Sequence, residues 1–249
     1  MVCGASRGIG RACAQEFARQ GARVILVSRR QEALEKVRES LDGKEHRILA
    51  ADFDHPPALE ASTKEFLLQA GPVHVLLNNA GGPPSGAVLD ARPEAFLAAF
   101  RQHLISFHLL AQVVIPVMRE SKYGRIVNIV STSVRQPIRG LGVSNTVRSA
   151  VAGWAKTLST EVAPFGITVN NILPGATLTD RLSEIVRERA RRSGRDDKVV
   201  EAEMIAEIPA GRFGTPEEIA AAAAFLAGPF AGYITGVSLP VDGGRTLSI

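Results

Sequence analysis

The chain has 249 residues, of which 45% are hydrophobic, and it carries a formal net charge of +4. This length suits one domain with a large core, and the longest apolar run, Ile219 to Ala227, is too short to cross a bilayer. The basic residues are scattered and only 5% of residues are aromatic, which argues against a nucleic-acid-binding surface.

We expect a cytoplasmic protein without a bound metal. No charged-then-apolar leader precedes the first motif, which argues against a secretory signal. The two cysteines, Cys3 and Cys13, have neither the spacing of a metal site nor that of a redox pair. Both are therefore expected to be reduced thiols.

Short apolar runs alternate with amphipathic segments along the whole chain. The expected strands lie at Val24–Val27, Ile48–Ala50, Val73–Leu77, Ile126–Val130, Ile167–Ile172 and Val237–Val241. Helices are expected at Arg11–Gln20, Gln31–Leu41 and Glu94–Arg119. This alternation predicts an α/β fold with a doubly wound parallel sheet and helices on both faces. No repeat or change of composition divides the chain, so residues 1–249 are expected to form one domain.

The first expected strand is unusually short, since only Met1-Val2-Cys3 precede a glycine-rich loop. Strands of five or six residues are usual. Either the start has been placed too late and a segment is missing, or the strand is minimal. We favour the first explanation, because a shortened central strand would weaken the loop that follows.

The loop that follows this strand has the properties of a phosphate-binding turn. It reads Gly4-Ala5-Ser6-Arg7-Gly8-Ile9-Gly10 and leads into a helical segment. Glycines permit a tight turn and let backbone N–H groups approach a pyrophosphate at the positive end of a helix.

The end of the second strand bears on the choice of nucleotide. It reads Val27-Ser28-Arg29-Arg30 and has no acidic residue that would accept hydrogen bonds from a ribose 2′-hydroxyl. Ser28 and Arg29, together with Arg7, would instead bind a 2′-phosphate. A nucleotide with a 2′-phosphate is therefore expected in preference to one with a free 2′-hydroxyl.

Two further segments bear on substrate and stability. The stretch from Arg181 to Lys198 is rich in arginine, which fits either a solvated helix face or attraction of an acidic substrate. Thr215-Pro216-Glu217-Glu218 is the pattern of a capping box and predicts the start of a helix that ends near Ala227.

Several motifs in order resemble those of the short-chain dehydrogenase/reductase family, and its 3-oxoacyl-ACP reductase-like members in particular. They are Gly4–Gly10 with Cys3 in the place of a threonine, Asn78–Gly81, Gly124–Asn128 before Ser131, Pro174-Gly175, Pro209–Glu218, Tyr233–Gly236 and Val241–Gly244. The resemblance covers nearly the whole chain and implies a Rossmann-like domain that binds a nicotinamide dinucleotide. It also implies a homo-oligomer, and a lid over the substrate that is formed by residues 178–210.

The resemblance implies cofactor contacts beyond the glycine loop. Asp52 is expected to bond the adenine, with Phe53 beside it, and Asn79 is expected to support the ribose region together with Ala80 and Gly81. Thr179, which follows Pro174, Gly175 and Thr177, is expected to reach the nicotinamide carboxamide. A plainer alternative for Asp52 is that it caps a turn.

The expected catalytic positions depart from the family pattern. Ser131 matches the family's serine, but its tyrosine, thirteen residues on, is replaced by Ser144, and its lysine, four residues later, by Arg148. The family's helix asparagine corresponds to His103. The only tyrosines, Tyr123 and Tyr233, lie far from this motif in the sequence.

These substitutions remove the family's proton donor, because a serine hydroxyl is far less acidic than a phenol with a pKa near ~10. Arg148 keeps a cation that can hold ribose hydroxyls, but arginine stays protonated at neutral pH. A water between the two serines is one possible donor. His103 is another, since histidine titrates near neutral pH, although a lone histidine on an apolar helix is more often structural.

The sequence favours an NADP(H)-dependent oxidoreductase that acts on a carbonyl or alcohol substrate, such as a 3-oxoacyl compound or another ketone, with a non-standard proton donor. One alternative is a nucleotide-binding protein without turnover that serves as a sensor or partner subunit. Another is an enzyme that uses the nucleotide for different chemistry, such as elimination.

Overall fold

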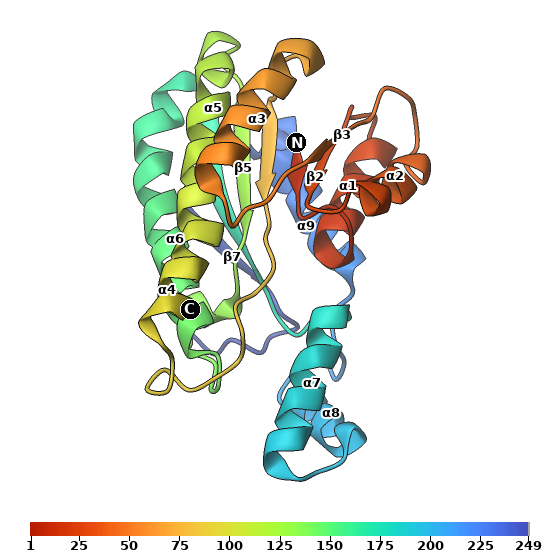
Figure 1. Ribbon diagram of the computed structural model, residues 1–249, viewed down its shortest axis with the longest axis vertical. Helices are drawn as coiled ribbons and strands as arrows, with labels where there is room; N and C mark the ends of the chain where they lie inside the picture. Colours follow the sequence, from red (N-terminus) through yellow and green to blue (C-terminus); the bar gives the residue numbers. More distant parts are fainter. Residues whose placement is uncertain (249) are drawn as a thin grey trace.

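The computed structural model describes residues 1–248, and these form a parallel sheet with helices on both faces (Figure 1). From one edge to the other the seven strands are β3 (Arg47–Ala50), β2 (Ile25–Ser28), β1 (Val2–Cys3), β4 (Val75–Asn78), β5 (Gly124–Ile129), β6 (Ile167–Pro174) and β7 (Ser238–Val241). The predicted fold class is confirmed.

The helices divide between the two faces of the sheet. One face is covered by α1 (Gly8–Arg19), α2 (Gln31–Glu39) and α9 (Pro216–Ala227), and the other by α3 (Pro56–Ala70), α5 (Ser106–Glu120) and α6 (Gly142–Val162). The short helix α4 (Pro93–Phe100) packs against α6 on this second side. Short turns of 3₁₀ helix occur at η2 (Thr132–Val134), η3 (Ala163–Phe165) and η4 (Pro229–Ala231). In the described part of the chain, no helix has the length and apolar character needed to cross a membrane.

Two helices stand apart from these layers. Figure 1 shows α7 (Asp180–Ser193) and α8 (Asp197–Ala206) extending below the sheet from the end of β6. They pack on each other through a small apolar cluster that includes Leu182, Val186 and Met204. This pair occupies most of the segment expected to form a lid.

The expected strands are all present, with ends that differ from the predicted ones by at most two residues. The central ones read as continuous apolar runs because helices bury them on both sides, and every residue of β5 is buried. The capping box of α9 is also confirmed. The Glu218 backbone N–H donates to Thr215 Oγ1 at 3.3 Å, and the Thr215 N–H donates to Glu218 Oε2 at 2.8 Å.

The long helix predicted over Glu94–Arg119 is interrupted. A π-helical turn, η1 (Arg101–Ile105), separates α4 from α5. A π turn inserts extra backbone into a helix and is frequent at functional sites, and apolar periodicity does not reveal it. The turn carries His103, whose side chain is buried.

Strand β1 fixes where a ligand can bind. It pairs with β2 through Val2 and Leu26 and with β4 through Val2 and Leu77, so successive strands are added on opposite sides of it. In open parallel sheets the crevice at such a switch point, beyond the carboxyl ends of the strands, is the usual ligand site.

Candidate active site

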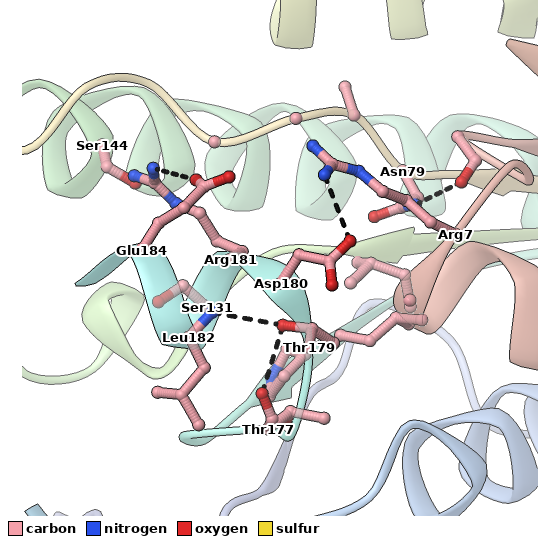
Figure 2. Close-up of a pocket in the computed structure, with 18 of the residues that line it drawn as sticks. Arg7, Asn79, Ser131, Ser144, Thr177, Thr179, Asp180, Arg181, Leu182 and Glu184 are labelled. Carbon is pink, nitrogen blue, oxygen red and sulfur yellow. Dashed lines mark hydrogen bonds and ion pairs between the residues drawn. The ribbon is translucent and has the colours of Figure 1, made fainter. Parts of the chain in front are cut away.

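A cavity of about 810 Å³ opens at this switch point (Figure 2). It brings together all but two of the residues that the sequence analysis selected: Gly4, Ser6, Arg7, Gly8, Ile9, Ser28, Arg29, Asp52, Phe53, Asn79, Ala80, Gly81, Ser131, Ser144, Arg148, Pro174, Gly175, Thr177 and Thr179. The two that do not line it are Gly10 and His103.

The glycine loop has the backbone that a phosphate cradle needs. Gly4 and Gly8 have φ angles of +61° and +54°, which L-residues with a side chain rarely adopt. A Cβ atom at Gly10 would lie 2.8 Å from Asn79 Nδ2 and closer still to the carbonyl oxygen of Gly4. Gly10 therefore lets helix α1 pack on the loop while the free N–H groups at the helix start face the cavity.

Two residues expected to contact the nucleotide also shape the loops around it. Asn79 Nδ2 donates to the carbonyl oxygen of Cys3 at 3.3 Å, which ties the end of β4 to the glycine loop. Asp52 Oδ1 accepts a hydrogen bond from the Asp54 backbone N–H at 3.0 Å, as a turn-capping aspartate does. Both side chains still line the cavity.

The end of β2 presents a polar group without a partner. Ser28 Oγ is buried and has no hydrogen-bond partner in the described structure. Beside it, Arg29 lies 3.6 Å from Asp54, and Arg7 lies 3.3 Å from Asp180 across the cavity mouth. Both ion pairs are largely solvent-exposed and therefore weak, so a phosphate could replace their carboxylates. The orphaned hydroxyl and the two guanidinium groups fit a 2′-phosphate.

Ser131, Ser144 and Arg148 are all part of the wall of the cavity. Ser131 follows β5, and its Oγ accepts a hydrogen bond from the Ser133 backbone N–H at 3.1 Å. Ser144 and Arg148 lie one turn apart on α6, so they present side chains on the same face of that helix. The tyrosines are elsewhere, since neither Tyr123 nor Tyr233 lines the cavity.

Arg148 is a buried cation. Only 8% of the residue is exposed, and its Nη1 donates to the carbonyl oxygen of Ile129 at 2.7 Å. Burial, and the charge of Arg181 after it, lower the pKa of Arg148 from 12.5 to about 10. Arg148 therefore remains protonated at neutral pH, although it holds its proton less tightly than an exposed arginine does.

His103 lies behind this wall, not in it. It is fully buried, and neither ring nitrogen has a hydrogen-bond partner of ordinary geometry in the described structure. Burial, followed by the charge of Arg148, lowers the pKa of His103 well below its usual value, and the backbone of Gly81 offsets part of that shift. The imidazole is therefore neutral at neutral pH and has no direct access to a ligand in the cavity.

The start of α7 closes one side of the cavity (Figure 2). Thr179 caps this helix by accepting a hydrogen bond from the Leu182 N–H at 3.4 Å, and its own hydroxyl donates to the Thr177 carbonyl oxygen at 3.2 Å. It also packs against the glycine loop, because a Cβ atom at Gly8 would lie 3.3 Å from its methyl group. The lid and the glycine loop thus meet at Thr179.

A ladder of buried side chains beneath the site was not predicted. Asn78 donates to Asn128 and Asn128 to Asn171, each at 2.9 Å, and Asn171 donates to Ser238 at 3.1 Å, so the ladder joins β4 to β7. Buried amides bonded in this way hold strands in register next to the site. The signal was present in the sequence, as asparagines inside otherwise apolar runs.

Comparison with known proteins agrees with this geometry. A family model described as Enoyl-(Acyl carrier protein) reductase matches residues 4–246. The chain is 33% identical over 244 residues to a 3-oxoacyl-[acyl-carrier-protein] reductase of Vibrio cholerae, covering 98% of this chain and 95% of that protein.

Solved structures of similar proteins contain either nicotinamide nucleotide. The L-sorbose reductase of Gluconobacter frateurii, complexed with NADPH and L-sorbose, superposes with a TM-score of 0.91 at 31% identity, over 100% of this chain and 96% of that one. The 3-ketoacyl-(acyl-carrier-protein) reductase of Brucella melitensis, complexed with NADH, has a TM-score of 0.85 at 31% identity, over 98% and 96%.

Proposed function

Because the chain belongs to the short-chain dehydrogenase/reductase family, we propose that it is an NADP(H)-dependent oxidoreductase that interconverts a carbonyl compound and an alcohol without a tyrosine as the proton donor. The observation that carries this proposal is the single cavity that joins the glycine loop to Ser131, Ser144 and Arg148. The proposed nucleotide site therefore lies next to polar groups that could bind the carbonyl oxygen of a substrate.

The nucleotide would extend along the carboxyl ends of the strands. The glycine loop and the start of α1 would hold the pyrophosphate, while Arg7, Ser28 and Arg29 would bind the 2′-phosphate. All of Asp52, Asn79, Arg148 and Thr179 line the cavity. Asp52 and Asn79 would lie beside the adenosine, and Arg148 and Thr179 would lie beside the nicotinamide. When bound, NADPH supplies the hydride that is added to the carbonyl carbon.

The protein's own groups would act on the carbonyl oxygen. The hydroxyls of Ser131 and Ser144 would donate hydrogen bonds to it, and the Arg148 cation would stabilise the negative charge that develops there. A cation in a buried site interacts more strongly than one in water. The proton would come from a water held between the two hydroxyls, while the buried, neutral His103 would take no direct part in proton transfer.

We expect the protein to bind NADPH and to oxidise it with a carbonyl substrate. The Ser131→Ala variant should bind NADPH with the parent's affinity but turn over about 10²-fold more slowly, because one hydrogen-bond donor to the developing oxyanion is lost. Nucleotide fluorescence measures binding, and loss of NADPH absorbance against a panel of ketones and aldehydes measures turnover. Ser183→Ala, on the exposed side of α7, is the matched control.

Tight NADPH binding with no turnover on any member of the panel would refute the proposed activity. The lack of a tyrosine in the cavity would then favour a nucleotide-binding protein that acts as a sensor or partner subunit.

The choice of nucleotide is tested at the end of β2. Ser28→Asp places a carboxylate where it accepts from a ribose 2′-hydroxyl and repels a 2′-phosphate. We expect the ratio of kcat/KM for NADPH over NADH to fall by about 10²-fold, since like charges in contact cost several kcal/mol. Titrations with both nucleotides check this, with Ser62→Asp on α3 as the control. A ratio that stays unchanged, with NADH binding no tighter, would contradict the assignment of the phosphate to Ser28.

A further inference from the structure

The substrate end of the cavity carries more positive than negative charge. Its wall contains Arg148, and its lid contains Arg181. Of the two lid carboxylates that line the cavity, Asp180 pairs with Arg7 and Glu184 pairs with Arg181. No carboxylate in the described structure forms an ion pair with Arg148, whose printed hydrogen bond goes to a backbone carbonyl. Phosphates of a nucleotide at the glycine loop would lie at the other end of the cavity, so they leave this excess of charge in place.

The two guanidinium groups influence each other. Arg181 is the charged group that contributes to the lowered pKa of Arg148, which means that the two cations repel across the cavity. Two like charges in a partly buried site are unfavourable unless an anion lies near both. The lid therefore brings the Arg181 cation toward the buried Arg148 cation. An anionic ligand would stabilise this arrangement.

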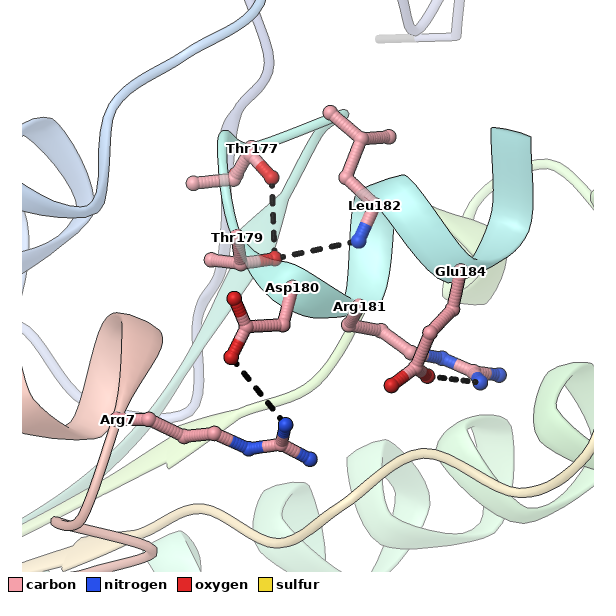
Figure 3. Close-up of polar contacts among 7 residues, drawn as sticks. All are labelled: Arg7, Thr177, Thr179, Asp180, Arg181, Leu182 and Glu184. Atoms are coloured by element: carbon pink, nitrogen blue, oxygen red, sulfur yellow. Dashed lines mark hydrogen bonds and ion pairs between the residues drawn. The ribbon is translucent and has the colours of Figure 1, made fainter. Parts of the chain in front are cut away.

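Arg181 is held by contacts that a ligand can exchange (Figure 3). Its Nη2 donates to the carbonyl oxygen of Pro83 at 2.6 Å, which joins α7 to the opposite wall. Its Nη1 lies 3.3 Å from Glu184 Oε2 on the next turn of the helix. The Glu184 side chain is 43% exposed, and an i,i+3 pair of this kind contributes little stability. The Pro83 contact thus fixes the guanidinium in the cavity, while its other nitrogen already donates to a carboxylate.

We propose that the substrate is an oxo acid or hydroxy acid, and that Arg181 binds its carboxylate in place of Glu184 while Arg148 faces the carbonyl oxygen. This inference rests on the proposed function, because it names the substrate class of the same site. The carboxylate is a recognition group and is unchanged by the reaction. A hydride is added to the carbonyl carbon and a proton to its oxygen.

The test compares acids with neutral analogues of the same shape. Each acid is compared with its methyl ester: acetoacetate with methyl acetoacetate, and levulinate with methyl levulinate. The parent and Arg181→Ala are assayed on all four compounds, with Arg189→Ala on the same helix as the matched control. The parent should prefer each acid. Arg181→Ala should raise KM for the acids by about tenfold to a hundredfold, because a hydrogen-bonded ion pair is lost. KM for the esters and all kcat values should stay within a few-fold of those of the parent.

Glu184→Gln gives a second test with the opposite sign. It removes the carboxylate that competes for Arg181, so KM for the acids should fall while KM for the esters stays constant. Equal use of acids and esters by the parent, or equal effects of Arg181→Ala on both, would overturn the inference and leave the proposed function standing.

Binding separates this inference from the proposed activity. Quenching of NADPH fluorescence on titration with butyrate, a carboxylate without a reducible carbonyl, measures carboxylate binding without turnover. Binding that is lost in Arg181→Ala, in a protein that turns over nothing, would support the carboxylate site and refute the oxidoreductase. No binding to the NADP(H)-loaded parent and no turnover of either acid would refute the carboxylate site.

Discussion

Replacing Ser144 by tyrosine and Arg148 by lysine together should raise turnover of a carbonyl substrate by about 10²- to 10⁴-fold, which is the usual contribution of a positioned general acid. Ser144 lines the cavity, so a phenol at this position would extend toward the substrate oxygen. A phenol has a pKa near ~10, and the cation one helical turn away would lower it, so that proton donation becomes favourable near neutral pH.

The matched control is Ser144→Phe with Arg148→Lys, which fills the same space without a hydroxyl. We expect this variant to be no faster than the parent, while NADPH fluorescence shows that all three proteins bind the nucleotide. The rate of NADPH oxidation at several pH values is the measurement. If the tyrosine variant is no faster than the phenylalanine variant, proton donation does not limit the parent, and the view of the site as lacking only its acid is wrong.

The sequence located the strands and the cavity well because parallel sheets are regular. Buried strands read as apolar runs, and the segments after them carry the ligand-binding residues at one edge of the sheet. The order of the motifs alone predicted that three residues lie at the same edge of the sheet, because each follows or ends a strand: Gly4, Ser131 and Pro174. The cap at Thr215 was equally predictable, because its hydrogen bonds are local in sequence.

The features that the sequence did not provide depend on contacts between distant segments. His103 lies in a π-helical turn that apolar periodicity does not reveal, and it does not line the cavity. The bond from Arg181 to Pro83 joins residues 98 positions apart. The lowered pKa of Arg148 likewise requires the depth of its burial and the position of Arg181, neither of which follows from residue spacing.

Gly10→Ala should nearly abolish nucleotide binding and also destabilise the fold. The added Cβ would lie 2.8 Å from Asn79 Nδ2 and would press on the carbonyl oxygen of Gly4, which is backbone and cannot turn aside. Either the start of α1 moves away from the loop, or Asn79 gives up its bond to Cys3. Both changes misplace the N–H groups that would face the pyrophosphate. Losing one or two charge-assisted hydrogen bonds weakens binding by roughly a hundredfold or more.

Gly153→Ala is the matched control, because it makes the same change inside a helix. Nothing lies within 4 Å of a Cβ atom at Gly153 in α6. Alanine there should stabilise the protein by about 1 kcal/mol through its greater helix propensity, while the overpacking at Gly10 should cost about 1–3 kcal/mol. Urea unfolding measures stability, and NADPH fluorescence measures affinity. A Gly10→Ala protein that binds NADPH as the parent does would show that the pyrophosphate does not lie at this loop, and the proposed cofactor site would have to be abandoned.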